Sequence, residues 1–186
     1  MYKPDHVICN NEKFDLYISK SQLDERIAEL GRQIDEDYEG KRPILIGILN
    51  GAYIFLADLM RHLSISCEVD FIKLSSYGDE KVSSGKVTER KELDADIESR
   101  HVILVEDIVD TGLSMSFMIN KLKERHPESI SVVTLLHKKV ATKYDVNLDY
   151  VGFEIPNRFV LGYGMDYAQE GRNLAQIYAL SDNQNA

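Results

Sequence analysis

Three carboxylates stand within five residues near the middle of the chain, at Glu106, Asp107 and Asp110. The apolar run 102–105 that precedes them is long enough for a buried strand, and residues 111–114 (TGLS) follow directly with the pattern of a helix start. Carboxylates bind hydroxyls and divalent cations, while the free N–H groups at a helix N-terminus bind phosphate. The segment therefore indicates chemistry on a phosphorylated sugar.

The same residues also allow simpler interpretations. Asp110 could only cap the following helix, and Glu106 and Asp107 could be solvated residues at a strand end. Neighbours on a strand point to opposite faces, so these two acids cannot both face a core. A Mg²⁺ phosphotransfer site of the haloacid-dehalogenase type is a further alternative. That type requires D-x-D-x-T after its strand, whereas this chain has E-D-x-x-D-T.

Strand and helix patterns alternate along the chain and must position these acids. A first helix is expected to start at Ser21 and to bury one face, formed by Leu23, Ile27, Leu30 and Ile34. The apolar run Pro43–Leu49 predicts a strand buried on both faces. Further strands are expected at 67–74, 130–136, 150–153 and 177–180. The pattern predicts an α/β fold with a mostly parallel, twisted sheet flanked by helices, and ligands beyond the carboxyl ends of the strands.

Composition limits the class of protein. With 186 residues and 44% hydrophobic content, residues 1–186 are expected to form one domain. The net charge of −9 argues against a nucleic-acid or membrane partner, since both need basic surfaces. Cys9 and Cys67 are expected to be reduced structural thiols. The polar start and the absence of a long apolar run predict a cytoplasmic protein.

Residues 75–99 differ from the rest because Ser, Gly, Lys, Glu and Asp dominate them. Loops of this length inside compact domains are usually lids, arms or disordered segments. We expect a mobile lid loop here, beginning at Ser76 and Tyr77.

The acidic segment Val105–Gly112 (VEDIVDTG) resembles the 5-phosphoribosyl pyrophosphate (PRPP) binding motif of type I phosphoribosyltransferases. Five further segments resemble the same family in the same order: Ile48–Ala52, Leu74–Tyr77, Leu135–Lys139, Val151–Pro156 and Phe159–Tyr167. Together they cover most of the chain and are similar to the hypoxanthine-guanine phosphoribosyltransferases. The resemblance implies a parallel-sheet domain with a small hood region built from the two ends of the chain.

This resemblance implies a reaction in which hypoxanthine or guanine displaces pyrophosphate from C1 of PRPP, with Mg²⁺ as cofactor. Glu106 and Asp107 would then hold the ribose hydroxyls and a metal, and Asp110 would accept the proton of purine N7 as the catalytic base. The 5′-phosphate is assigned to Thr111, Gly112, Leu113 and Ser114, with Asp110 beside them. Pyrophosphate contacts are assigned to Leu49, Asn50, Gly51 and Arg172.

The purine side is implied in the same way. Lys138 would donate to the exocyclic O6, which favours 6-oxopurines over adenine. Phe159 would stack on the base, and the backbone of Val160 would meet its Watson–Crick edge. Asp166 is grouped with them and is also expected to be a ligand of a second metal. The alternatives are a solvated lysine, a core phenylalanine and, at Arg172, an ordinary surface arginine.

Three positions depart from the family pattern. Asn50 stands where many members carry Lys or Arg, which removes a cation from the pyrophosphate loop. Leu113 stands where some members have Lys, and Ser114 where Thr is common. The peptide before Asn50 is often cis in the family, so a cis Leu49–Asn50 bond is a further expectation.

Two other functions stay open from the sequence. A regulator of the same fold would bind PRPP or nucleotides and control transcription, although the acidic chain has no basic cluster for nucleic acid. A related enzyme would use uracil or adenine as its base. The family is usually dimeric or tetrameric, so a homo-oligomer is expected.

Overall fold

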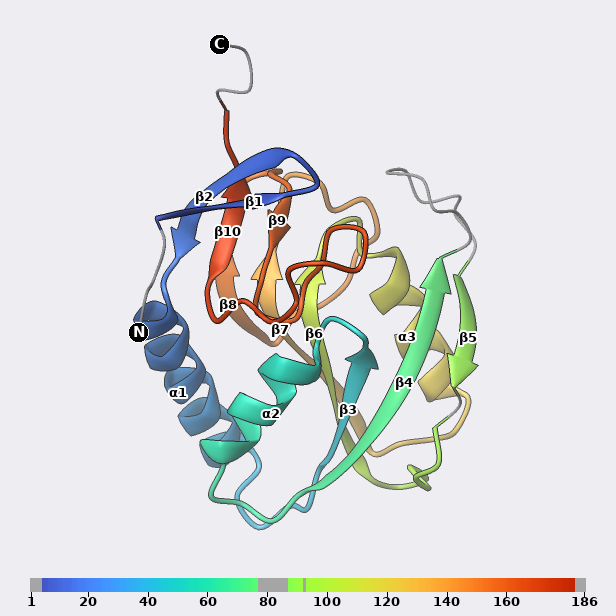
Figure 1. The fold of residues 1–186 in the computed structure, drawn as a ribbon. Coiled ribbons are helices and arrows are strands. Elements are labelled where there is room, and N and C mark those ends of the chain that lie inside the picture. Colours follow the sequence, from blue (N-terminus) through green and yellow to red (C-terminus); the bar gives the residue numbers. More distant parts are fainter. Residues whose placement is uncertain (1–4, 77–86, 92, 183–186) are drawn as a thin grey trace.

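A six-stranded sheet forms the centre of the structure, a computed structural model that describes residues 5–76, 87–91 and 93–182 (Figure 1). Five neighbouring strands run parallel, and β5 joins the edge antiparallel to β4. The order across the sheet is β5 (Val87–Lys91), β4 (Glu68–Ser76), β3 (Ile44–Leu49), β6 (His101–Val109), β7 (Ser129–His137) and β8 (Tyr150–Glu154). The predicted α/β class is confirmed.

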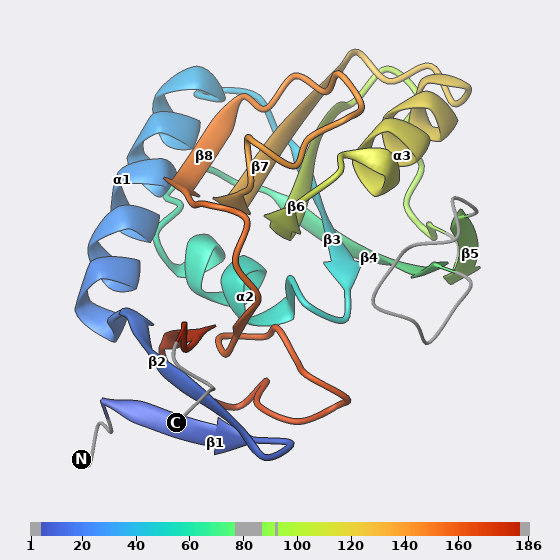
Figure 2. The ribbon, with the colours of Figure 1, turned by 90° about the horizontal axis from the view of Figure 1, so that it is seen from above.

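Helices cover both faces of this sheet, as Figure 2 shows. Helices α1 (Lys20–Asp37) and α2 (Tyr53–Arg61) pack on one face, and α3 (Leu113–Lys123) packs on the other. The face of α1 predicted to be apolar is buried, but the predicted start at Ser21 was wrong. Ser19 is the N-cap instead, because its hydroxyl accepts from the backbone of Gln22 while the Gln22 side chain accepts from the Ser19 backbone.

A second, antiparallel sheet forms the hood, which we define as β1, β2, β9 and β10 (Figure 1). Its strands come from both ends of the chain, in the order β1 (His6–Cys9), β2 (Glu12–Ile18), β10 (Ile177–Leu180) and β9 (Val160–Leu161). Phe14, Leu161 and Tyr178 form its small core, each at most 2% exposed. The hood implied by the family resemblance is confirmed.

The segment predicted as a lid is partly regular. Strand β4 runs on to Ser76, and β5 returns beside it, so 87–91 are strand rather than loop. Tyr77 lies outside the described residues. The mobility of 75–99 stays a prediction. Among the helices that the structure describes, none is long and apolar enough to cross a membrane.

Candidate active site

Strand β6 carries the first two acids inside it rather than after its end. It pairs with β3 only as far as Val105, but it continues beside β7 to Val109. Glu106 and Asp107 therefore lie just beyond the part of β6 that pairs with β3, which opens that side to a ligand. Glu106 is 7% exposed and Asp107 is half-buried, in agreement with their predicted alternation.

The Glu106 carboxyl is held in an environment that disfavours its charge. Burial raises its pKa well above the usual value, and the neighbouring Asp107 carboxylate raises the pKa further. No Lys or Arg among the described residues forms an ion pair with either acid. A divalent cation fits here because it would neutralise two adjacent carboxylates. The described acids, Asp166 included, do not form a three-ligand cluster, so such a cation would need ligand oxygens too.

The loop after β3 packs directly on Asp107. The Leu49–Asn50 peptide is cis, as expected from the family pattern. A Cβ on Gly51 would lie 1.8 Å from Asp107 Oδ2, so only glycine leaves room for that carboxylate. Gly164 approaches from the other side, where a Cβ would lie 2.1 Å from the Gly51 carbonyl oxygen. Two glycines therefore bring β6, the 49–51 loop and the 163–172 loop into contact.

A pocket of about 200 Å³ opens at the N-terminus of α3. Gly112 is the N-cap, with a left-handed φ of 83° and no side-chain cap, so Asp110 is not the cap of this helix. The first turn leaves backbone N–H groups unbonded within the helix, and Leu113 N lies 3.4 Å from Thr111 Oγ1. No Lys or Arg appears among the described residues that line the pocket, which include Glu106, Asp110 and Ser114.

Asp110 and Lys138 face each other across the ends of β6 and β7. Lys138 Nζ lies 2.9 Å from Asp110 Oδ2. Lys138 is buried at 8% exposure, whereas the Asp110 side chain is 46% exposed. A buried lysine at a strand end is not a solvated one, so that alternative is wrong. The pair places one proton acceptor and one donor side by side.

The segment after Lys138 packs against the loop 110–112 that precedes α3. The backbone N–H groups of Lys143 and Tyr144 both donate to the Thr111 carbonyl, at 3.0 and 3.1 Å. A Cβ on Gly112 would lie 2.9 Å from the Tyr144 carbonyl oxygen. The shape of the loop 110–112 is therefore set by Lys143 and Tyr144, which lie about thirty positions later in the chain.

Phe159 lies in the connection that leads into the hood. Its ring centroid is 5.1 Å from Tyr167 and 6.1 Å from Phe14. It remains 39% exposed, so it is not an ordinary core phenylalanine. Val160 follows it on β9 and is buried. The Phe159 ring is thus in contact with Phe14 of the hood and with Tyr167, while part of the ring stays accessible.

Asp166 and Arg172 form an ion pair, with Arg172 Nη2 at 2.7 Å from Asp166 Oδ1. Gln169 N donates to the other oxygen of Asp166, and Arg172 Nη1 donates to the Gly164 carbonyl. Arg172 is therefore partly buried and bonded twice, and its contact with pyrophosphate stays a prediction. The pair braces the loop that touches Gly51.

The structure unites the predicted residues in three contacts: Asp107 with Gly51, Asp110 with Lys138, and Asp166 with Arg172. Phe159 contacts Phe14 of the hood and Tyr167 instead. Sequence reasoning missed Lys73, which pairs with Leu49 across β3 and β4. It also missed Thr142, whose hydroxyl lies between the Asp110 and Lys138 backbones. Strand register reveals the first, and the turn after β7 reveals the second.

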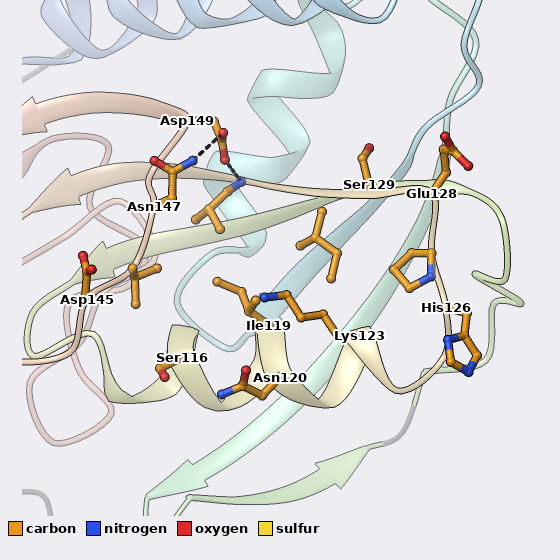
Figure 3. A pocket seen from close by; sticks show the side chains of 14 residues that line it. Ser116, Ile119, Asn120, Lys123, His126, Glu128, Ser129, Asp145, Asn147 and Asp149 are labelled. Atoms are coloured by element: carbon orange, nitrogen blue, oxygen red, sulfur yellow. Dashed lines mark hydrogen bonds between the residues drawn. The ribbon is translucent and has the colours of Figure 1, made fainter.

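A larger pocket, of about 580 Å³, lies elsewhere (Figure 3). It is bounded by α3, the start of β7 and the segment 145–149, with Lys123, Asn120 and Asp145 at its rim. It contains none of the residues predicted for the site. Size alone therefore does not identify the reactive pocket, which is marked by its carboxylates and helix N-terminus.

Comparisons with known proteins agree with this geometry. Residues 19–168 match the family model described as phosphoribosyl transferase domain, which defines the class of protein. The hypoxanthine-guanine phosphoribosyltransferase of Bacillus subtilis is 43% identical over 88% of this chain and 91% of its own. The chain belongs to the hypoxanthine-guanine phosphoribosyltransferase family.

Other similar proteins extend the comparison. A crystal structure of a hypoxanthine-guanine phosphoribosyltransferase from Bacillus anthracis has a TM-score of 0.85 and 41% identity, covering 90% of this chain and 98% of that one. The bifunctional protein TilS/HprT of Listeria monocytogenes is 43% identical over 90% of this chain. The chain spans about a quarter of that relative, 26% of its length.

Proposed function

We propose that this chain transfers the phosphoribosyl group from PRPP to N9 of hypoxanthine or guanine, which yields IMP or GMP and pyrophosphate. The observation that carries the proposal is the Asp110–Lys138 pair, 2.9 Å apart, next to a phosphate-sized pocket at a helix N-terminus. A 6-oxopurine carries N7 and O6 on one edge. In the tautomer protonated at N7, a carboxylate accepts from N7–H while an adjacent ammonium donates to O6.

On the phosphoribosyl side, the sugar is held by Glu106 and Asp107 and the 5′-phosphate by the first turn of α3. Backbone N–H groups and the hydroxyls of Thr111 and Ser114 bind the phosphate without a basic side chain. Pyrophosphate lies against the 49–51 loop, with Arg172 as the nearby cation. Bond breaking at C1 leaves positive charge on the ribose, and the carboxylates of this half stabilise it.

On the purine side, Phe159 stacks on the base and the Val160 backbone meets its edge. Lys138 donates to O6, and Asp110 accepts the proton that N7 carries in the attacking tautomer. When the base arrives, the Lys138 ammonium keeps a contact with Asp110 or exchanges it for O6. Adenine presents an amino group there, which leaves a buried ammonium without an acceptor.

We further propose Mg²⁺ at Glu106 and Asp107, with Asp166 near a second ion. Bound there with the oxygens of PRPP, it supplies neutralisation of the leaving pyrophosphate. The raised pKa of Glu106 supports this, because a carboxyl that is costly to ionise alone gains most from a cation. A homo-oligomer, dimeric or tetrameric, and a cytoplasmic location stay predictions.

The test compares PRPP-dependent turnover of hypoxanthine, guanine, xanthine, adenine and uracil by the purified protein, with Mg²⁺ and with EDTA. We expect nucleotide from hypoxanthine or guanine, pyrophosphate in equal amount, and loss of turnover in EDTA. Turnover of adenine or uracil alone would assign the chain to a related enzyme. No product from any base, together with salt-sensitive nucleic-acid binding, would favour the regulator.

A further inference from the structure

Thr142 makes three contacts with one hydroxyl group at the back of the Asp110–Lys138 pair. Its Oγ1 lies 3.1 Å from the Asp110 carbonyl oxygen and 3.2 Å from the Lys138 carbonyl oxygen. The third contact is His137 Nε2, at 3.1 Å. The hydroxyl is thus shared by the backbones of both residues that face the purine.

The number of protons available determines which of these groups donate and which accept. The hydroxyl has a single proton and both carbonyls can only accept, so bonding to a carbonyl uses that proton and leaves the hydroxyl oxygen to accept. In the arrangement that keeps the His137 contact as well, His137 donates from Nε2 to the hydroxyl oxygen, and this sets its tautomer. His137 and Thr142 together form a short chain of donors that ends on the purine-facing backbones.

His137 and Thr142 lie where the ladder between β6 and β7 ends. Val109 pairs with His137 in the parallel ladder, and Lys138 N donates to the Val109 carbonyl as the two strands separate. Beyond that bond no ladder holds Asp110 to Lys138. The Thr142 hydroxyl spans the gap from a turn that the Ala141 N–H to Lys138 carbonyl bond closes at 2.8 Å.

We propose that Thr142, oriented by His137, is a positioning residue that fixes the spacing of Asp110 and Lys138. Through that spacing it sets the preference of the site for 6-oxopurines over 6-aminopurines. The inference rests on the proposed function, because the two groups must meet N7 and O6 of one base together. A loose pair would still bind PRPP, since Thr142 is not one of the described residues that line the pocket at the N-terminus of α3.

The experiment replaces Thr142 by Val, which keeps the shape and removes the hydroxyl, and by Ser, which keeps the hydroxyl. Val140→Thr is the matched control, because it makes the reverse exchange on an 87% exposed side chain in the same segment. For each protein, kcat and KM are measured for hypoxanthine, guanine and adenine at saturating PRPP, with the PRPP Kd and Tm.

We expect Thr142→Val to lower kcat/KM for hypoxanthine by roughly three- to tenfold, the value of one hydrogen bond, and to lower the hypoxanthine-to-adenine ratio with it. Thr142→Ser should recover most of the ratio, and the PRPP Kd should change by less than about twofold. His137→Leu should reproduce the Val phenotype, while His137→Gln, which can still donate, should not.

An unchanged base ratio in an active Thr142→Val protein would overturn the inference, even if its Tm fell, because that result describes a structural role only. Equal changes in the Val140→Thr control would overturn it too. Absence of turnover in the parent chain is a separate outcome that overturns the proposed function, and this inference with it.

Discussion

The two halves of the proposed site, one for the phosphoribosyl group and one for the purine, are built differently. The phosphoribosyl half comes almost entirely from one segment, 105–114, with the short loop 49–51 against it. The purine half is assembled from Lys138, Phe159 and Asp166, which lie on three separate segments. Backbone groups hold the first half, through the Thr111 carbonyl and the N-terminus of α3. Side-chain pairs hold the second.

This difference separates the recognition of phosphate from the recognition of the purine base. A phosphate is recognised by N–H groups whose direction the helix sets, so a contiguous segment suffices. A purine edge must be matched by donors and acceptors at fixed spacing, and that spacing comes from adjacent strands. Variants of the two halves should therefore separate PRPP binding from turnover and base choice.

The largest effect is expected from Asp110→Asn. Loss of the proton acceptor should lower kcat by about 10²–10⁴-fold, while the PRPP Kd changes little. Steady-state kinetics and isothermal calorimetry measure the two quantities. Asp145→Asn, at the rim of the other pocket, is the matched control and should retain turnover. Near-parental kcat in Asp110→Asn would remove the base assignment.

Gly51→Ala should damage the phosphoribosyl half. The new Cβ displaces the Asp107 carboxylate, so PRPP affinity should fall by about a hundredfold, as expected for the loss of a charged contact. Gly40→Asn is the control, because Gly40 has open space around it and Asn tolerates its positive φ of 71°. Unchanged PRPP binding in Gly51→Ala would show that Asp107 does not hold the sugar.

Lys138→Gln should damage the purine half alone. We expect kcat/KM for hypoxanthine to fall by about tenfold or more and adenine to be affected less, because the charged donor to O6 is lost. Competition assays with both bases measure the ratio. Lys139→Gln is the control for the loss of one positive charge, because the Lys139 side chain is 71% exposed. A fall in PRPP affinity instead would contradict the division into halves.

The smallest expected effect is a change in Tm, measured for Glu106→Gln in the presence of EDTA. Burial raises the pKa of Glu106 above the ordinary 4.5, so the folded state binds this proton more tightly than the unfolded state does. That stabilisation is present below the ordinary pKa and is lost as the pH rises through the raised one. The Tm of the variant should be a few degrees higher than that of the parent at about pH 8. The reason is that about 1 kcal/mol shifts Tm by 2–4 °C in a domain of this size.

The difference in Tm should close below about pH 4, where the parent carboxyl is protonated in both states. Differential scanning fluorimetry across pH gives both values, and Asp96→Asn serves as an exposed-acid control. An equal Tm at both pH values would show that Glu106 ionises without cost. PRPP binding should weaken in the same variant, so this carboxyl stabilises the complex at the expense of the free protein.

Much of this organisation was predictable from local pattern. Continuous apolar runs predicted the buried parallel strands, and the E-D-x-x-D-T-G run predicted acids before a phosphate-binding helix. The start of α1 was misplaced because Ser19 and Ser21 both precede a polar residue at the third position. Only Ser19 with Gln22 makes the reciprocal bonds. Strand β5 was missed because its residues are polar and lie on the edge of the sheet.

The sequence by itself determined the chemistry present: three carboxylates, a helix start, a lysine after a strand and an aromatic before another. The tertiary structure decided which of these meet. The parallel register of β6 and β7 placed Lys138 against Asp110, and two glycines let the 49–51 loop close on Asp107. Contacts between segments far apart depend on register and close approach, which no local pattern encodes.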